Sequence, residues 1–499
     1  MIPDDAIERL LEGCQSIAKQ CETQGIQEWE IVASQGYGRS LDIEAGRISL
    51  ASGGGEGGFG VRVLQDGRYG YAHLVDPSGA EHAVSEALSI AKASPKIEDF
   101  SLPNAKDASP VEGMRDDAIL NLSADDLLTQ GDAIISEVAS LDKRAMVIGG
   151  GVGIGAEAGV MLSSEGVEAS GITTSHGLGV QVSIEEDGQM TSSWESCSSR
   201  KLMDGIPSCV PMAVEWAQKT RDPISVESQA VDTAVLMTPQ GISSLFSNII
   251  RPSILGERMV RKESYWSEKM NETVLDSHLT LLDNRRLEGG FASSSRDGEG
   301  VPTSCHTIVE NGVLRKMIWS TRDAAKNVAE GRIDSATTTG SASRGSHMSP
   351  PTTGCGDVQL LSSNKAQSRD ELIQTMGEGY IVHSVMGAHT ANPTSGDFSV
   401  TTSTILRVED GEIIGALKQA GVSGNLFKAI SNNVHLGMPS TSGGVSSTGS
   451  NHRSDILFSS NDPTADARKP ARCAAQRIRA NRQGKRSGRK RGDLQTRGA

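Results

Sequence analysis

Aromatic residues are scarce in this sequence of 499 residues, where Phe, Trp and Tyr make up 3%, whereas glycine occurs 56 times. That composition favours strands joined by tight turns over an architecture of long helices. No apolar run of about 18 residues or more occurs, and the N-terminus lacks the charged and apolar regions of a signal peptide. We therefore expect a cytoplasmic protein of two or three domains, without export or membrane insertion.

Cysteine pairs of the C-x-x-C type are also absent, and the seven cysteines are an odd number. Such a set indicates neither a disulfide framework nor a structural zinc knuckle, so a reducing compartment fits best. Cys14 and Cys21 lie at helical spacing among apolar residues, and we expect both in the core. Cys305 directly precedes His306, but neighbours on a strand point to opposite faces, which disfavours them as nucleophile and base.

The first 222 residues show one order of elements twice. Each copy is predicted to hold a helix, two hairpins and a closing helix, and four turn sequences mark the hairpins: Glu44-Ala45-Gly46, Gln65-Asp66-Gly67, Ser164-Glu165-Gly166 and Glu186-Asp187-Gly188. The prediction is therefore an α+β fold, with an N-terminal α+β domain over residues 1–222 that contains an internal duplication of helix-hairpin units.

Two glycine-rich runs fall within this domain. Residues 149–158 contain G-x-G-x-x-A, but a dinucleotide site needs such a loop to open a helix, and here a strand and a hairpin follow. We interpret this run as a glycine-rich strand. Residues 53–60 are interpreted as a flexible loop between strands.

Residues 223–437 are predicted to form a β-rich domain, either an antiparallel sheet or a barrel-like arrangement, with helical stretches near residues 240–260, 321–330 and 368–377. Residues 438–499 turn Ser/Gly-rich and then basic, a composition that does not offset the entropy of ordering. We therefore expect a disordered basic tail that folding does not need. The chain's net charge of -14 disfavours nucleic acid, which only this tail could attract.

Metal chemistry would need ligands at coordinating spacing, and neither H-E-x-x-H nor H-E-x-x-x-H occurs. The nearest substitute is His383 and His389 with Asp397 downstream, but the two histidines do not share one helical face. We interpret them as structural or surface groups. Three further acidic residues could form a cluster of carboxylates: Asp297, Glu299 and Glu310. Charged residues more commonly lie at the rims of hairpins, so we interpret these three in that way.

Several short segments, in their order along the chain, resemble the TldD/PmbA family, once called modulators of DNA gyrase. They are GVRV at 60–63, DGR at 66–68, SEGV at 164–167, DGEGVPT at 297–303, ENGVL at 310–314, MG at 386–387, NPTSGDFS at 392–399 and GNL at 424–426. The match covers roughly residues 1–437. The resemblance implies an α+β N-terminal domain followed by a β-rich domain, in agreement with the pattern of elements.

Members of this family are of two kinds. The TldD kind carries H-E-x-x-x-H early in its second domain and pairs with a PmbA/TldE kind that lacks this motif. The corresponding stretch here, residues 241–257, contains no histidine, so the chain resembles the PmbA/TldE kind. The resemblance implies no catalytic residue, metal or cofactor in this chain, a zinc or similar metal in a TldD-like partner, peptides as substrates, and possible homodimers of the isolated chain.

In such a pair the cleft lies between the subunits, where an unfolded peptide can be held as an added strand. We expect residues 386–399 to shape it, with five candidate contact residues: Asn392, Pro393, Thr394, Gly396 and Asp397. The same residue types also build turns, and the two interpretations have equal weight. Two other functions stay open, a non-proteolytic regulator of a topoisomerase or toxin system and a self-sufficient hydrolase using His383, His389 and Asp397.

Overall fold

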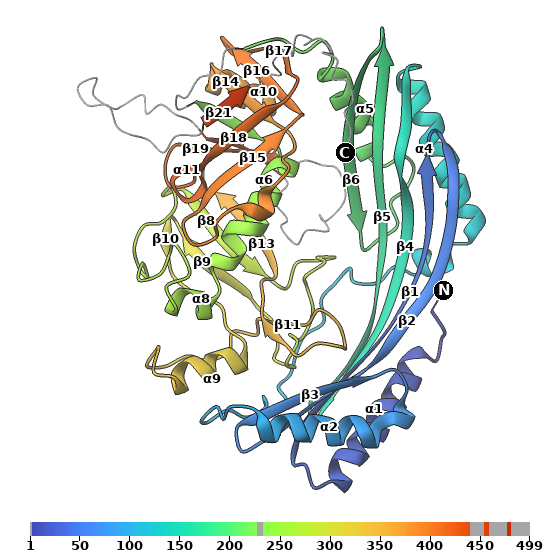
Figure 1. Cartoon of the computed structure of the whole chain (residues 1–499), viewed down its shortest axis with the longest axis vertical. Coiled ribbons are helices and arrows are strands. Elements are labelled where there is room, and N and C mark those ends of the chain that lie inside the picture. The colour runs from blue at the N-terminus through green and yellow to red at the C-terminus, as the bar shows by residue number, and fades with distance from the viewer. Residues whose placement is uncertain (1, 227–232, 440–453, 459–476, 481–499) are drawn as a thin grey trace, which may run out of the picture.

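The computed structural model describes residues 2–226, 233–439, 454–458 and 477–480. Its N-terminal domain is one antiparallel sheet of six strands in the order β3-β2-β1-β4-β5-β6 (Figure 1). The strands are β1 (Glu28–Glu44), β2 (Arg47–Gln65), β3 (Arg68–Leu74), β4 (Ala145–Ser163), β5 (Glu168–Glu186) and β6 (Gln189–Ser199). Helices α1 (Ala6–Thr23) and α2 (Ala80–Ala93) belong to the first half, and α3 (Asp117–Asn121), α4 (Ala124–Leu141) and α5 (Cys209–Lys219) to the second.

The predicted duplication is confirmed by this topology. Each half runs helix, three strands, helix, and the halves meet where β1 pairs antiparallel with β4. All four predicted turns connect neighbouring strands, with Ala45, Asp66 and Asp187 in the left-handed region of φ. Each half has its own core beneath its helices, and Cys14 and Cys21 are fully buried in the first of them, as predicted.

The strands are much longer than the turn signals suggested, and the prediction of a loop at residues 53–60 was wrong. The whole run lies inside β2 and pairs with β1. At two positions of this run only glycine fits, because the segment around His347 approaches the sheet closely. A Cβ on Gly58 would lie 2.6 Å from the His347 ring, and one on Gly60 only 2.2 Å from the His347 carbonyl. The strand interpretation of residues 149–158 is confirmed by β4.

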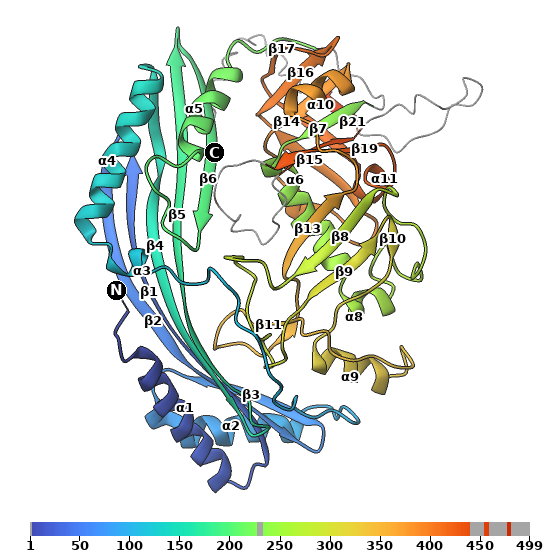
Figure 2. The same ribbon diagram turned by 180° about the vertical axis from the view of Figure 1, so that it is seen from behind.

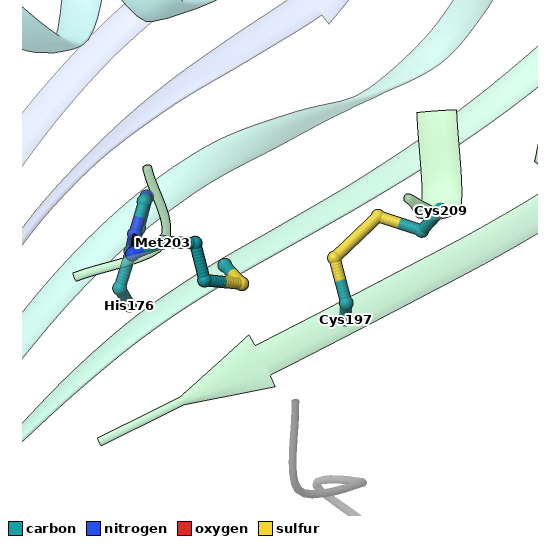
Figure 3. The surroundings of a disulfide bond; sticks show 4 residues. All are labelled: His176, Cys197, Met203 and Cys209. Atoms are coloured by element: carbon teal, nitrogen blue, oxygen red, sulfur yellow. Dashed lines mark hydrogen bonds between the residues drawn. A yellow bond between two sulfur atoms is a disulfide. The ribbon is translucent and has the colours of Figure 1, made fainter. Parts of the chain in front are cut away.

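A disulfide bond joins Cys197 of β6 to Cys209 at the start of α5 (Figure 3). Beside it, the ring of buried His176 accepts a hydrogen bond at Nδ1 from the Met203 N–H, 3.1 Å away. The odd cysteine count gave no hint of this pair. It forms because the chain returns from the edge strand to the first turn of the helix that covers it.

The C-terminal domain is built mainly from antiparallel sheets with short helices between them. One sheet has the order β10-β9-β8-β13, formed by β8 (Leu279–Asn284), β9 (Cys305–Glu310), β10 (Val313–Leu314) and β13 (Asp357–Ser362). A second has the order β17-β16-β14-β7-β20-β19, formed by β7 (Ala234–Met237), β14 (Gly379–Val382), β16 (Ile405–Glu409), β17 (Glu412–Leu417), β19 (Val434–Pro439) and β20 (Ser454–Phe458). Only β7 and β14 pair parallel among the described strands of this domain.

Smaller sheets pair β11 (Ala342–Ser343) with β12 (Thr352–Thr353), and β18 (Ala420–Asn425) with both β15 (Asp397–Thr402) and β21 (Arg477–Ala480).

The predicted helical stretches are confirmed by α6 (Pro239–Leu245), the π-helical η2 (Phe246–Ile250), α7 (Arg251–Ser253), α8 (Gly256–Val260), α9 (Thr321–Ala329) and α10 (Arg369–Met376). In β9, exposed Cys305 and buried His306 face opposite sides, as expected.

The expectation that folding does not need the chain beyond residue 437 was wrong for residues 454–458. They form β20, which lies between β7 and β19 in the largest sheet of the domain. Ile456, Leu457 and Phe458 are at most 4% exposed, and Asp455 pairs with Arg369 at 2.7 Å. The second domain therefore extends past its predicted end. Residues 438 and 439 of the predicted tail end β19, and the rest of it, apart from β21, lies outside the described residues.

The long sheet curves, and the C-terminal domain lies on the inner side of the curve (Figures 1 and 2). Helices α1, α2 and α4 lie on the outer side. Within the part of the chain that the structure describes, no helix has the length and apolar character needed to cross a membrane.

Candidate functional site

Four of the five predicted cleft residues belong to one tight turn that leads into β15. Asn392 Oδ1 accepts hydrogen bonds from the backbone N–H groups of Thr394 (2.9 Å) and Ser395 (3.1 Å). Gly396 donates its N–H to the Asn392 carbonyl (2.8 Å) and has a φ of +80°, which favours glycine. A Cβ on Gly396 would lie 2.3 Å from the Phe427 ring. Turn building thus accounts for the residue types at these positions.

Asp397, the first residue of β15, is the fifth. Its carboxylate accepts hydrogen bonds from Asn425 Nδ2 (2.8 Å) and Ser395 Oγ (2.7 Å), and these two bonds lower its pKa. The structure thereby brings together two segments that carried the family resemblance, residues 392–399 and 424–426. Asp397 remains exposed, as do Asn392 and Thr394, so a partner or substrate can still contact this turn.

The turn also packs against the segment 241–257. The Pro393 carbonyl accepts a hydrogen bond from Ser253 Oγ (3.2 Å) of α7, and Thr394 Oγ1 donates to the Glu263 carbonyl (3.0 Å) just beyond α8. The predicted cleft residues therefore lie beside segment 241–257, whose sequence contains no histidine.

Segment 241–257 itself is filled with apolar side chains. Ile242, Leu245, Phe246, Ile249 and Ile250 are at most 1% exposed and form part of the core of the domain. The single carboxylate of the segment, on Glu257, pairs with Lys326 at 3.0 Å. The segment offers no set of donors that fits zinc. In the described residues at large, no three His, Cys, Asp or Glu side chains gather where they could hold a metal ion.

His383 and His389 lie in different surroundings. His383 is buried, and its Nδ1 lies 2.9 Å from Thr238 Oγ1 while its Nε2 contacts the Glu195 carboxylate. Its ring stacks on Trp216, with centroids 3.8 Å apart and planes 17° apart. Because Glu195 and Trp216 belong to β6 and α5, His383 fastens the two domains together. His389 is exposed in the short helix η3 (Ala388–Thr390).

A second contact between the domains is ionic and buried. Arg62 of β2, fully buried, pairs with Glu30 of β1 (2.6 Å) and with Glu299 of the C-terminal domain (3.1 Å). Glu30 also contacts Arg344. Two further segments of the resemblance, GVRV and DGEGVPT, thus meet here, and SEGV joins them because a Cβ on Gly300 would lie 2.9 Å from Val167. These motif residues are accounted for by the junction between the domains.

The interpretation of Asp297 and Glu299 as a hairpin rim was wrong, since both are buried; Glu310 is exposed at its hairpin. Asp297 accepts hydrogen bonds from the backbone N–H groups of Glu299 (2.8 Å), Val301 (3.0 Å) and Ala342 (2.9 Å). Burial, reinforced by the neighbouring Glu299 charge, nevertheless raises the pKa of Asp297 to about 6. Desolvation outweighs the three donors at this site.

This raised pKa predicts a pH dependence of stability. The folded protein holds the Asp297 proton more tightly than the unfolded chain. The contribution of this proton to the free energy of unfolding is therefore fully present below about pH 4 and is lost as the pH rises through about 6. Relative to an Asp297→Asn variant, the free energy of unfolding of the wild type should fall by about 1–3 kcal/mol across that window. Urea unfolding of both proteins at several pH values measures it. If the free energies of unfolding of the two proteins changed with pH in the same way, the raised pKa of Asp297 would be contradicted.

Two adjoining cavities, of about 500 and about 530 Å³, lie over the glycine-rich middle of the long sheet. They share Gly38, Gly54, Gly155 and Ser175, which occupy one face of β1, β2, β4 and β5. Glu56, Glu157 and Arg200 supply charge, and Phe291 closes the space from the C-terminal domain. Because glycines supply much of the floor, the sheet backbone is less covered by side chains here than along the rest of the strands.

Sequence reasoning missed this cavity. Its signal is the alternation of glycine along strands, as at Gly36 and Gly38 or Gly153 and Gly155, which removes side chains from one face while the other keeps them. Such alternation is visible only once the strands are known to run through the glycine-rich stretches.

Comparisons with known proteins agree with this architecture. Family models match residues 29–91, as "PmbA/TldA metallopeptidase domain 1", and residues 231–459, as "PmbA/TldA metallopeptidase C-terminal domain", together more than half of the chain. An uncharacterized protein of Methanocaldococcus jannaschii is 28% identical over 80% of this chain and 89% of its own length. The metalloprotease PmbA of Escherichia coli is 24% identical over 87% and 92% of the two chains.

Among solved structures, TldE from Thermococcus kodakarensis superposes with a TM-score of 0.79 at 21% identity, covering 94% of this chain and 99% of that one. At that identity the likeness concerns the fold. The second family model ends at residue 459, directly after β20, which agrees with the extended boundary of the second domain. This chain belongs to the PmbA/TldD metallopeptidase family.

Proposed function

We propose that this chain is a PmbA/TldE-type subunit that supports a TldD-type subunit in cutting unfolded peptides in the cytoplasm, and that the partner supplies the metal. The observation that carries the proposal is segment 241–257. Where the TldD kind has H-E-x-x-x-H, this chain has buried apolar side chains and one carboxylate paired with lysine. Relatives named as metalloproteases support the proteolytic side of the proposal.

A subunit without metal ligands contributes by holding and orienting. A metal in the partner would polarise the peptide carbonyl or activate water. This chain would present backbone and turn surfaces to an extended peptide, and orientation of that kind lowers a barrier without any bond made to the orienting group. The turn at residues 392–397, exposed at Asn392, Thr394 and Asp397 and packed on segment 241–257, is the surface we assign to partner or peptide.

The test is reconstitution. The purified chain alone should not cleave an unstructured peptide, and a TldD-type chain with H-E-x-x-x-H should require it for full activity, with a chelator abolishing cleavage by the mixture. Thr394→Arg should lower the activity of the mixture by about tenfold or more, because small misplacements of a bound peptide are costly. His82→Arg, exposed on α2, is the matched control and should have no effect.

Three outcomes would contradict the proposal. Cleavage by this chain alone would favour the self-sufficient hydrolase. Full activity of the partner without this chain would remove its supporting role. Binding to a topoisomerase or a toxin, with no stimulation of any TldD-type chain, would favour the regulator.

A further inference from the structure

Three of the glycines in the floor of the two cavities are required neither by packing within the chain nor by backbone conformation. A Cβ on Gly54 would meet no atom within 4 Å, and the atoms nearest to a Cβ on Gly36 and on Gly38 would lie at 3.8 and 3.6 Å, which is ordinary contact. None of the three has a positive φ. Glycine weakens a strand, so side chains here would stabilise the sheet and fill the cavities. The space over this glycine floor is therefore available to a ligand.

An arginine without an anionic partner stands at one end of the glycine floor. Arg200 donates from Nη1 and Nη2 to the backbone carbonyls of Thr174 (3.3 Å) and Phe291 (3.2 Å), and its guanidinium lies 4.6 Å from the centre of the Phe291 ring. Its Nε is buried without a hydrogen-bond partner among the described residues, and Arg200 forms no ion pair with any of them. Burial lowers its pKa. A guanidinium in these surroundings favours a carboxylate ligand, which fits its planar set of donors.

Two carboxylates stand at the other side of the first cavity. Glu56 of β2 and Glu157 of β4 are both cross-strand neighbours of Gly36 in β1, so their side chains leave the same face of the sheet on either side of a residue that has none. Both are exposed, both line the cavity that Arg200 lines, and neither forms an ion pair with a described residue. Two carboxylates without a cationic partner favour an ammonium group as their ligand.

The spacing of these charged groups fits a short peptide. Glu157 lies on β4 and Arg200 directly after β6, with β5 between them, so about 10 Å separates their backbones at the usual spacing of strands (Figure 2). Three extended residues also span about 10 Å. The cavities, of about 500 and about 530 Å³, lie within the usual range for sites of small molecules, about 300–1,000 Å³. A tripeptide carries an ammonium at one end, a carboxylate at the other and a thin backbone between them.

We propose that the glycine floor is a binding site for short peptides with free ends, in which Glu56 and Glu157 hold the terminal ammonium and Arg200 holds the terminal carboxylate. The site selects by length rather than by side chain, because a longer extended peptide cannot place its two ends at both charged groups at once. In a complex with a TldD-type subunit, peptides of this size are products of cleavage. That role rests on the proposed function, whereas the binding itself does not.

The test is isothermal titration calorimetry of the full-length chain, without a partner, using three forms of trialanine. Trialanine with free ends should bind saturably. Acetylation of its N-terminus and amidation of its C-terminus each remove one charge, and each should raise Kd by about tenfold or more, because a charge-assisted hydrogen bond is lost. Equal affinity for the three forms, or no binding of trialanine at millimolar concentration, would overturn the proposal.

Variants of the charged residues assign each end of the peptide. Arg200→Gln should bind trialanine about tenfold or more weakly, and amidation should then cost nothing further, whereas acetylation should still weaken binding. Glu56→Gln combined with Glu157→Gln should give the reverse pattern. Glu86→Gln, exposed on α2, is the control and should bind as the wild type does. If both variants responded alike to the two modifications, the assignment of the two ends would be wrong.

A valine at Gly54 tests the floor without removing a charge. Its side chain has room in the fold, and valine favours strands, so the melting temperature should not fall. Binding of trialanine should weaken by about tenfold or more, because the added side chain occupies the cavity. Unchanged binding by Gly54→Val would contradict the proposed site.

Thermal melting of each variant, followed by circular dichroism, separates lost binding from lost folding. The titrations use this chain alone and measure no cleavage. Failure of its supporting role in peptide cleavage would therefore leave a positive binding result standing, and failure to bind trialanine would leave the supporting role standing.

Discussion

Replacing Arg62 by alanine should lower the free energy of unfolding by about 3–5 kcal/mol, because the carboxylates of Glu30 and Glu299 would stay buried after losing their common partner. Arg344, which contacts Glu30, compensates only in part. The loss is a large fraction of the stability of an ordinary domain. The domains should also separate more readily, since Glu299 belongs to one and Glu30 to the other.

Urea unfolding, followed by far-UV circular dichroism and by tryptophan fluorescence, measures this effect. Arg9→Ala is the matched control, since Arg9 pairs with Asp5 on the exposed face of α1, and its midpoint should not change. A midpoint for Arg62→Ala within error of the wild type would show that the buried network contributes nothing net to stability.

Ending the chain at residue 453 should unfold the C-terminal domain. The truncation removes β20, whose Ile456, Leu457 and Phe458 are at most 4% exposed, and it takes away the strand between β7 and β19. Loss of one large core side chain costs about 2–5 kcal/mol, so three together rival the whole stability of a domain. The truncated chain should show reduced strand signal and rapid proteolysis beyond residue 222.

A chain ending at residue 480 is the control, because it keeps β20 and β21 and should melt as the full-length protein does. Within the full-length chain, Leu457→Ala should by itself cost about 2–5 kcal/mol. An unchanged melting temperature for the chain ending at residue 453 would mean that β20 does not belong to the folded domain.

Elements governed by local chemistry were predictable from the sequence. The turns at Asp66-Gly67 and Asp187-Gly188 need left-handed φ values, which these residue types favour, and they lie where predicted. Helix α4 begins with a full capping box formed by Ser123 and Asp126, a local signal of the same kind. β20 was missed because Ile456-Leu457-Phe458 is a short apolar run amid polar sequence, and only distant β7 gives it a place.

In the candidate site, too, the local elements were predictable from the sequence and the contacts between distant residues were not. The turn built by Asn392 and Gly396 follows from residue types, whereas no spacing predicts that Arg62 meets Glu299 or that His383 meets Glu195. Those contacts depend on how the two domains are docked. The resemblance singled out most of these segments without indicating which of them touch.

The strand order of the C-terminal domain has a consequence for synthesis on the ribosome. β7 is made early, but its two neighbours, β14 and β20, come much later in the chain. The N-terminal domain ends its last helix at Lys219 and can fold while the rest is still being translated. β7 must instead wait with both edges unpaired until β14 has emerged, and with one edge unpaired until Phe458 has emerged. This delay makes the nascent second domain a client for chaperones that shield open strands.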